Sequence, residues 1–196
     1  MGIEYELKFR ATGKVLAVIA TEYSQYPSKQ FHMETTYYDT PSGALSQLHY
    51  TLRRRMENDK SVCTLKTPAT GLGRNEIELE CGNIEDAIPA LCAAGAPENF
   101  GTLVQEGILP VCSAKFHRTA ITLTLQDCTL ELALDSGTLT GGNKTIPLCE
   151  VEVELKKGEP ASADLFAKML AIQYGLLPET HSKFRRALSL YKGEKL

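Results

Sequence analysis

Residues 150–156 read EVEVELK, so charged and apolar side chains alternate without interruption. Because successive side chains of a β-strand point to opposite faces of a sheet, this pattern predicts a strand with one charged and one apolar face. The same alternation occurs at residues 4–10 (EYELKFR) and 74–80 (RNEIELE). One such strand is typical of any antiparallel sheet with a solvated face, but these three together carry eight carboxylates. We therefore expect a concentrated charged surface on the sheet.

Period-two runs elsewhere extend this strand-rich pattern. They predict strands at residues 3–10, 30–39, 49–57, 60–67, 74–81, 109–126, 128–135 and 147–156. Helical spacing and start signals predict helices at residues 14–25, 84–94, 161–175 and 181–192, with a weaker helical stretch at 100–106. No repeat, low-complexity stretch or linker divides residues 1–196, which predicts a single α+β domain built on an antiparallel sheet or barrel.

The composition excludes several classes of protein. With 43% hydrophobic and 23% charged residues, it is typical of neither a disordered nor a collagenous chain. Lys and Arg number 21 against 24 Asp and Glu, and the net charge of -3 argues against nucleic-acid binding. No apolar run approaches the ~20 residues that span a membrane, and charges begin at residue 4, so we expect a cytoplasmic protein without a secretory signal. Six cysteines without a Cys-x-x-Cys pair and four histidines without ligand spacing indicate neither a zinc nor a redox site.

The charges are sorted by sign along the chain. Arg53 and Arg55 share one face of the strand at 49–57, and Lys66 lies on the next strand, whereas the strands described first carry mostly Glu. Two like charges ~5 Å apart repel by about 3 kcal/mol at an effective dielectric constant of ~20. Each group therefore needs a counter-charge: a hard divalent cation for the carboxylates and a polyanion for the bases. If the sheet closed into a barrel with its charged faces inward and its apolar faces under helices, the lumen would suit a metal polyphosphate.

The order of these motifs along the chain resembles that of the CYTH proteins, also called triphosphate tunnel metalloenzymes. The resemblance covers essentially the whole chain. It rests on Glu4-x-Glu6-x-Lys8, Tyr38-Asp39-Thr40-Pro41 before Leu45, Leu52-Arg53-Arg54-Arg55, Leu65-Lys66, Arg74-x-Glu76-x-Glu78, Lys115 with Arg118, Asp135 before Gly137, Glu150-x-Glu152-x-Glu154-Leu155, and Ser182-Lys183 with Arg186.

The resemblance implies a fold and a set of site residues. The fold is an eight-stranded antiparallel β-barrel, a triphosphate tunnel with helices packed outside, whose lumen binds a triphosphate with two divalent ions, Mg²⁺ or Mn²⁺. The implied metal ligands are Glu4, Glu6, Glu152 and Glu154, with Glu76, Glu78 and Asp135 as further acidic candidates. The implied phosphate-binding residues are Lys8, Arg53, Arg55, Lys66, Arg74, Lys115, Arg118, Lys183 and Arg186. Among these, the candidate catalytic residues are Glu4, Glu6, Lys8 and Lys66.

Two positions fit this scheme less simply. Lys115 and Arg118 are three residues apart, so a regular strand places them on opposite faces. A β-bulge, or a strand that begins after Lys115, would be needed to aim both side chains inward. Tyr37 and Tyr38 are neighbours, so at most one of them faces the lumen.

The function expected from the resemblance is metal-dependent hydrolysis of a small triphosphate, with inorganic tripolyphosphate cleaved to pyrophosphate and phosphate as the leading case. A class IV adenylate cyclase, or a thiamine or nucleoside triphosphatase, is the alternative on the same fold. The chain has no Trp, the strongest stacking residue for a ring, and no recognisable adenine site. A non-catalytic polyphosphate-binding module is a further alternative. We expect a small triphosphate as the partner, no nucleic acid or membrane, and a monomer or homodimer.

Overall fold

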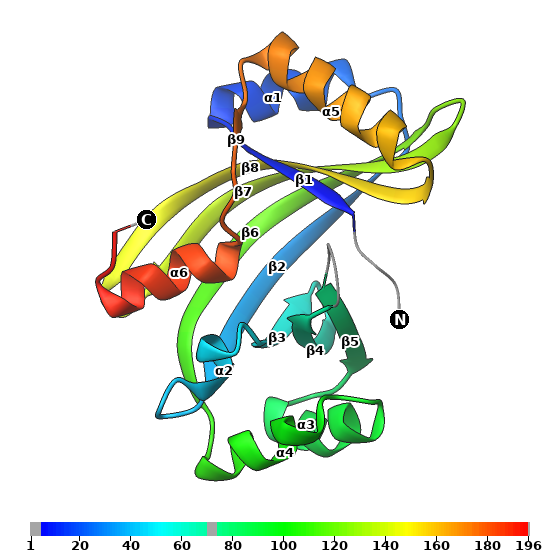
Figure 1. Ribbon diagram of the computed structural model, residues 1–196. Helices are drawn as coiled ribbons and strands as arrows, with labels where there is room; N and C mark the ends of the chain where they lie inside the picture. Colours follow the sequence, from blue (N-terminus) through cyan, green and yellow to red (C-terminus); the bar gives the residue numbers. More distant parts are fainter. Residues whose placement is uncertain (1–4, 70–73, 196) are drawn as a thin grey trace.

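The computed structural model describes residues 5–69 and 74–195, so Glu4 lies outside the described residues (Figure 1). Within them, nine strands form one antiparallel sheet in the order β5-β4-β3-β2-β6-β7-β8-β1-β9. The strands are β1 (Glu6–Arg10), β2 (Ser28–Asp39), β3 (Thr51–Glu57), β4 (Lys60–Pro68), β5 (Arg74–Glu80), β6 (Leu109–Thr124), β7 (Cys128–Gly141), β8 (Lys144–Gly158) and β9 (Leu177–Pro178). All eight predicted strands are present, and β9 adds a two-residue edge.

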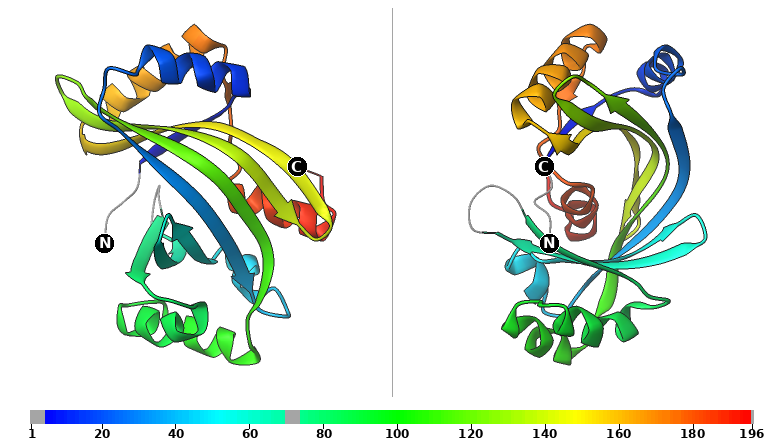
Figure 2. Two further views of the ribbon diagram at one scale, coloured as in Figure 1. Left: turned by 180° about the vertical axis from the view of Figure 1, so that it is seen from behind. Right: turned by 90° about the vertical axis from the view of Figure 1, so that its right-hand side faces the viewer.

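The sheet is strongly curved, like a tunnel wall (Figure 2). Its edge strands in the described part of the chain are β5 and β9, which are not paired to each other. The predicted α+β fold, with an antiparallel sheet that curves around a tunnel and helices packed outside, is therefore confirmed, although the last helix lies inside the curve and hydrogen bonds do not close the sheet into a ring.

Helices cover the convex face in two groups (Figures 1 and 2). The pair α1 (Gly13–Glu22) and α5 (Pro160–Tyr174) packs on β1, β7 and β8, where Leu132 and Val153 are fully buried. A second group covers β3, β4 and β5, and it consists of α2 (Ala44–Gln47), α3 (Ile84–Ala93) and α4 (Glu98–Leu103), which continues into the short helix η1 (Val104–Glu106). The apolar sides of the alternating strands thus form two separate outer cores.

The last helix, α6 (Lys183–Lys192), lies on the concave side instead. Its Ala187 and Leu188 pack against Phe116 and Leu139, which point inward from β6 and β7. At the end of β7, Gly141 lets α6 approach closely, because a Cβ atom there would overlap the backbone of Ala187. The helix therefore lies across one end of the curved surface that carries the charges.

Local signals explain where α6 begins and ends. The Ser182 hydroxyl accepts a hydrogen bond from the backbone N–H of Arg185 at 3.1 Å, which caps the first turn. At the other end Gly193 has a φ of 71°, the left-handed conformation that commonly ends helices. No helix in the described ranges is long and apolar enough to cross a membrane.

Candidate active site

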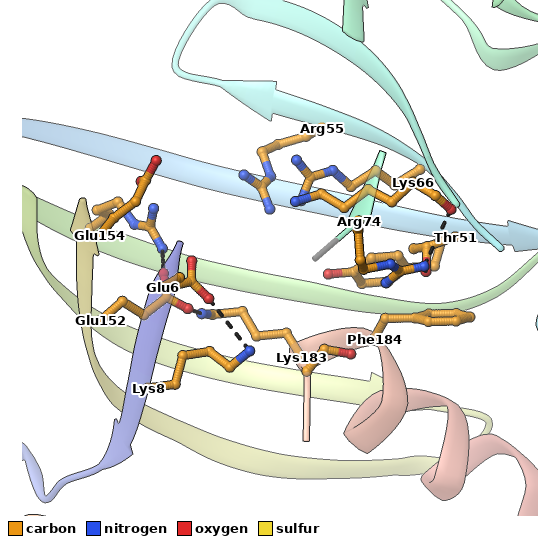
Figure 3. Close-up of a pocket in the computed structure, with 14 residues that line it drawn as sticks. Glu6, Lys8, Thr51, Arg55, Lys66, Arg74, Glu152, Glu154, Lys183 and Phe184 are labelled. Carbon is orange, nitrogen blue, oxygen red and sulfur yellow. Dashed lines mark hydrogen bonds and ion pairs between the residues drawn. The ribbon is translucent and has the colours of Figure 1, made fainter. Parts of the chain in front are cut away.

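The strand register gathers the acidic side chains on the concave face. Glu6 on β1 lies directly opposite Glu154 on β8, and Lys8 lies opposite Glu152. Directly opposite residues of an antiparallel pair point to the same face. We call Glu6, Glu152 and Glu154 the acidic wall (Figure 3).

The opposite side of the concave surface is cationic. We call Arg53, Arg55, Lys66 and Arg74 the cationic wall; they come from β3, β4 and β5. Arg53 lies 3.5 Å from Glu76, which also contacts Lys66 at 3.2 Å. Glu76 therefore lies between two cations of the wall.

Two features of the cationic wall would favour the binding of an anion. Burial and the nearby charge of Arg53 both lower the pKa of the Arg55 guanidinium. The buried Nε of Arg53 has no hydrogen-bond partner among the described residues. Because a buried polar group without a partner is costly, a multiply charged anion between these side chains would relieve both conditions.

A cavity of about 180 Å³ separates the two walls (Figure 3). Besides the two walls it is lined by Lys8, Tyr37, Thr51, Arg118, Ser182, Lys183 and Phe184. Thr51 shares the face of Arg53 on β3, and Tyr37 lies opposite Arg53 on β2. The alternation of side chains along these strands therefore directs both residues to the concave face. The cavity thus joins seven cationic side chains to three carboxylates.

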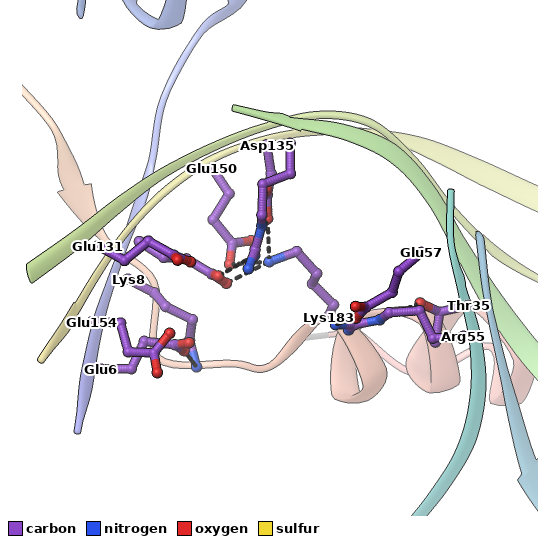
Figure 4. Close-up of polar contacts among 12 residues, drawn as sticks. Glu6, Lys8, Thr35, Arg55, Glu57, Glu131, Asp135, Glu150, Glu154 and Lys183 are labelled. Atoms are coloured by element: carbon purple, nitrogen blue, oxygen red, sulfur yellow. Dashed lines mark hydrogen bonds and ion pairs between the residues drawn. The ribbon is translucent and has the colours of Figure 1, made fainter. Parts of the chain in front are cut away.

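Behind the acidic wall lies a group of charges that we call the buried ion network (Figure 4). Its members are Arg118, Asp135, Glu150, Glu152, Lys183 and Arg186. Lys183 donates to Glu150 at 2.9 Å and to Glu152 at 2.5 Å, and its Nζ lies 2.9 Å from Asp135. Arg118 donates two bonds to Asp135, each of 2.7 Å, and another to Glu152. The network therefore fixes α6 to β6, β7 and β8.

Two carboxylates of the network, Glu150 and Glu152, have pKa values that are shifted in opposite directions. Burial raises the pKa of Glu150 to about 7, and the negative charge of Glu152 adds to this effect, although Lys183 opposes it. Burial opposes ionisation of Glu152 as well, but the charges of Lys183 and Arg118 prevail and hold its pKa well below the usual value. Glu152 thus stays ionised where the network meets the cavity.

Most of the predicted site residues meet at this cavity. They are Glu6, Lys8, Arg53, Arg55, Lys66, Arg74, Arg118, Glu152, Glu154 and Lys183. Glu76 and Glu78, predicted as further metal ligands, lie instead beside the cationic wall, where both contact Arg53.

Three other predicted residues lie away from the cavity. Lys115 is the clearest correction: β6 is regular there, so its side chain points to the convex side, 62% exposed, and contacts Glu34 at 2.6 Å. Asp135 is fully buried and, unlike Glu152, does not line the cavity. Arg186 contacts buried carboxylates rather than lining the cavity.

Sequence reasoning missed several functional neighbours. Glu150, which belongs to the motif at residues 150–155 but not to the predicted site residues, is fully buried and is contacted by Lys183 and Arg186. Glu179 is buried beside Arg186, and Phe184 reaches the cavity from the first turn of α6. Nothing in the local pattern signals these contacts, because they depend on how α6 docks.

The acidic wall has the chemistry of a site for a hard cation. Carboxylate oxygens are the ligands that Mg²⁺ and Mn²⁺ prefer. Glu6 lies 3.4 Å from Lys8, and Glu154 lies 2.6 Å from Lys156, so each of these carboxylates has a lysine ammonium group as an ion-pair partner. Within residues 5–69 and 74–195, no three His, Cys, Asp or Glu side chains are arranged as a finished metal site. Glu4, the fourth carboxylate of the predicted set, is outside those ranges.

Fold and site together define a class of protein: a curved antiparallel sheet that carries a cationic wall and an acidic wall on its concave face. The chain belongs to the CYTH domain family, whose model matches residues 2–188.

Relatives with sequence or structural similarity are known. The chain is 29% identical over 198 residues to the inorganic triphosphatase of Haemophilus influenzae, and the match covers 95% of this chain but 54% of that protein. The chain thus spans about half the length of this curated relative. A solved structure from Hippeastrum, described as a putative adenylyl cyclase with a dominant triphosphatase activity, is similar in fold, with a TM-score of 0.63, 20% identity, and coverage of 99% and 98% of the two chains. A putative adenylate cyclase from Bacillus halodurans gives a TM-score of 0.60 at 16% identity, with coverage of 94% and 96%.

Proposed function

We propose that this protein is a divalent-metal-dependent triphosphatase, and that its substrate is a small triphosphate, with inorganic tripolyphosphate as the leading candidate. One observation carries the proposal: a cationic wall that includes a buried, unpartnered nitrogen of Arg53 faces an acidic wall across a single cavity of about 180 Å³. A similar protein from Haemophilus influenzae is an inorganic triphosphatase, which supports an inorganic substrate.

The cationic wall would bind the phosphate chain. Guanidinium forks match phosphate oxygens, and Arg53 and Arg55 present two of them side by side on β3. Lys66 supplies a point charge from the next strand, where it can stabilise the negative charge that develops on the leaving pyrophosphate. Placing these charges in advance lowers the barrier, because they need no rearrangement as the transition state forms.

The acidic wall would hold Mg²⁺ or Mn²⁺ through Glu6, Glu152 and Glu154, with Glu4 as a further ligand. A divalent ion bound there orients phosphate oxygens and lowers the pKa of a water. Lys8 borders this region, so it can neutralise phosphate oxygens that face the carboxylates. In the overall hydrolysis, the oxygen of one water would join the terminal phosphorus as the bond to the bridging oxygen breaks. Phosphate and pyrophosphate would leave, with the two protons of the water carried by these products or released to solvent, so no residue of the chain needs to form a covalent intermediate.

The experiment that tests this function measures phosphate release from tripolyphosphate, ATP and thiamine triphosphate with Mg²⁺, with Mn²⁺ and with EDTA. We expect metal-dependent release that is fastest with tripolyphosphate. The variant Glu6→Gln should lower kcat/KM by more than the ~10–100-fold that changes to the outer shell of a metal site cost. Glu80→Gln is the matched control, because Glu80 pairs with Lys60 at an exposed position.

Three results would overturn the proposal. Formation of cyclic AMP from ATP without phosphate release from tripolyphosphate would identify a cyclase. Binding of tripolyphosphate without turnover under any metal condition would identify a binding module. Equal losses in Glu6→Gln and Glu80→Gln would remove the acidic wall from the reaction.

A further inference from the structure

A second cavity, of about 390 Å³, adjoins the first. The two share five lining residues, Lys8, Thr51, Arg74, Ser182 and Phe184, so they lie side by side. The second cavity lies between the loop that follows α2 and the first turns of α6. A ligand held between the two walls can therefore extend toward α6.

The charges around the two cavities differ. Three Glu side chains line the first cavity, but no Asp or Glu is among the described residues that line the second. Its ionisable residues are Lys8, His49, Arg74, His181 and Arg185, all of which are cationic or can become so. The cavity also borders the amino-terminal end of the ten-residue helix α6, where the helix dipole favours an anion. The lining thus has the charge of an anion site without the carboxylates of a metal site.

Specific contacts hold this lining in place. His49 has a φ of 58°, an unusual conformation for a residue other than Gly, and its carbonyl accepts a 2.6 Å hydrogen bond from Arg74. On the opposite side, His181 lies 3.6 Å from Glu179, and Arg185 lies 3.4 Å from Glu194. These two carboxylates lie outside the lining, so they orient the cations without occupying the cavity.

We propose that the second cavity is a subsite for additional phosphate groups, so that this protein binds linear polyphosphates of four or more phosphates better than tripolyphosphate. The inference rests on the proposed function, since it assigns three phosphates to the first cavity. A nucleoside would need groups that pair with a base and surfaces on which it stacks, and Phe184 is the only Phe, Tyr or Trp in the described lining of this second cavity. The abundance of positive charge favours an inorganic chain instead.

Binding measured without turnover tests the subsite separately from the reaction. Calorimetric titrations in EDTA compare inorganic tetraphosphate, tripolyphosphate and ATP on the full chain. We expect tetraphosphate to bind at least ~5-fold more tightly than tripolyphosphate, which at 1.4 kcal/mol per tenfold is about 1 kcal/mol. The variant His181→Ala/Arg185→Ala should bring this ratio close to one. Lys192→Ala removes a charge from the last turn of the same helix, outside both linings, and should keep the ratio of the wild type.

The outcomes separate this inference from the proposed function. A ratio of one or less in the wild type, or a ratio that the double variant leaves unchanged, would overturn the subsite even if tripolyphosphate is hydrolysed. Tighter binding of ATP than of tetraphosphate, lost in the same double variant, would assign the cavity to an organic group and would overturn it too. A tetraphosphate preference that depends on His181 and Arg185 supports the subsite, whether or not the assay of phosphate release succeeds.

Discussion

Two charged regions share the concave face, and they balance their charges in different ways. In the buried ion network, Lys183 contacts three carboxylates, and Arg118 is paired with Asp135 on the neighbouring strand. In the cationic wall, Arg53 and Arg55 lie side by side, burial and crowding lower the pKa of Arg55, and a buried nitrogen of Arg53 has no partner in the described part of the chain. The network pairs three cations with three buried carboxylates, although the Nε of Arg186 there also lacks a hydrogen-bond partner among the described residues. The cationic wall instead places neighbouring guanidinium groups together.

The difference assigns distinct tasks to similar residues. Removing one partner from a buried, satisfied ion network leaves a charge uncompensated, which is strongly destabilising. Removing a cation from a group of cations relieves repulsion, so the free energy of unfolding should change little. The substitution should weaken the binding of a ligand instead. Substitutions in the two regions should therefore separate stability from activity.

The largest effect is expected for Lys183→Met. The substitution leaves Asp135, Glu150 and Glu152 without their shared cation, so the free energy of unfolding should fall by about 3–5 kcal/mol. Urea denaturation at pH 8 measures the loss. Lys192→Met, an exposed change in the last turn of the same helix, is the matched control. A loss below ~1 kcal/mol for Lys183→Met would show that the network does not hold α6 in place.

The next largest effect is expected for Arg55→Met, and it should appear in activity. Arg55 lies in the cationic wall and bonds only Thr35 and Glu57 among the contacts described, so unfolding should change little. We expect kcat/KM for tripolyphosphate to fall by ~100-fold, about 2.7 kcal/mol of transition-state stabilisation. Arg54→Met is the control, because Arg54 points to the other face and donates to Ser61. Equal losses of activity in both variants would contradict the division of tasks.

The free energy of unfolding should also depend on pH through the carboxylates of the buried ion network. Because burial raises the pKa of Glu150 to about 7, the native state keeps a proton that the unfolded state has lost above its ordinary value of 4.5. The contribution of Glu150 is therefore fully present below pH ~4.5 and is lost as the pH rises toward 7, by an amount on the order of 1–3 kcal/mol. Glu152 has a lowered pKa and acts in the opposite sense, so its contribution is lost only as the pH falls below ~4.5.

Urea denaturation at pH 5, 6, 7 and 8 measures this effect. The free energy of unfolding of the wild type should fall between pH 5 and pH 8 relative to that of Glu150→Gln, because residue 150 cannot ionise in this variant. Parallel curves for the two proteins would show that Glu150 is already ionised at pH 5.

The smallest effect is expected for Lys115→Ala. Its side chain lies on the convex face in an exposed contact with Glu34, so kcat/KM for tripolyphosphate should stay within about two-fold of the wild type. Arg118→Ala, three residues along the same strand, removes a partner of Asp135 and Glu152 from the buried ion network, so it should lower the free energy of unfolding by about 3–5 kcal/mol. A large loss of activity in Lys115→Ala would place that side chain inside the tunnel after all.

The strand faces could be predicted from the sequence because they depend on a local period of two. Glu6, Glu152 and Glu154 alternate with apolar residues, and Arg53 and Arg55 do the same, so each side chain pointed where the pattern indicated. Parity also placed Lys115 and Arg118 on opposite faces. The resemblance suggested otherwise for Lys115, and the regular pairing of β6 shows that parity was the better guide.

Other features depend on contacts between distant segments and could not be predicted. Glu150 is buried because Lys183 and Arg186 reach it from a helix more than 30 residues away. The strand β7 continues past its predicted end at residue 135, and β8 begins before its predicted start at residue 147. Gly137 and Gly141 weaken the local strand signal in this region but allow close approach of neighbouring backbones. Close packing, rather than local propensity, determines these positions.

The most direct test of the central claim measures phosphate release from tripolyphosphate and the free energy of unfolding on the same preparations of wild type, Arg55→Met and Arg54→Met. We expect metal-dependent release by the wild type and Arg54→Met, a ~100-fold lower kcat/KM for Arg55→Met, and similar unfolding free energies for the wild type and Arg55→Met. Release that persists in Arg55→Met, or a loss explained by unfolding of that variant, would contradict the central claim.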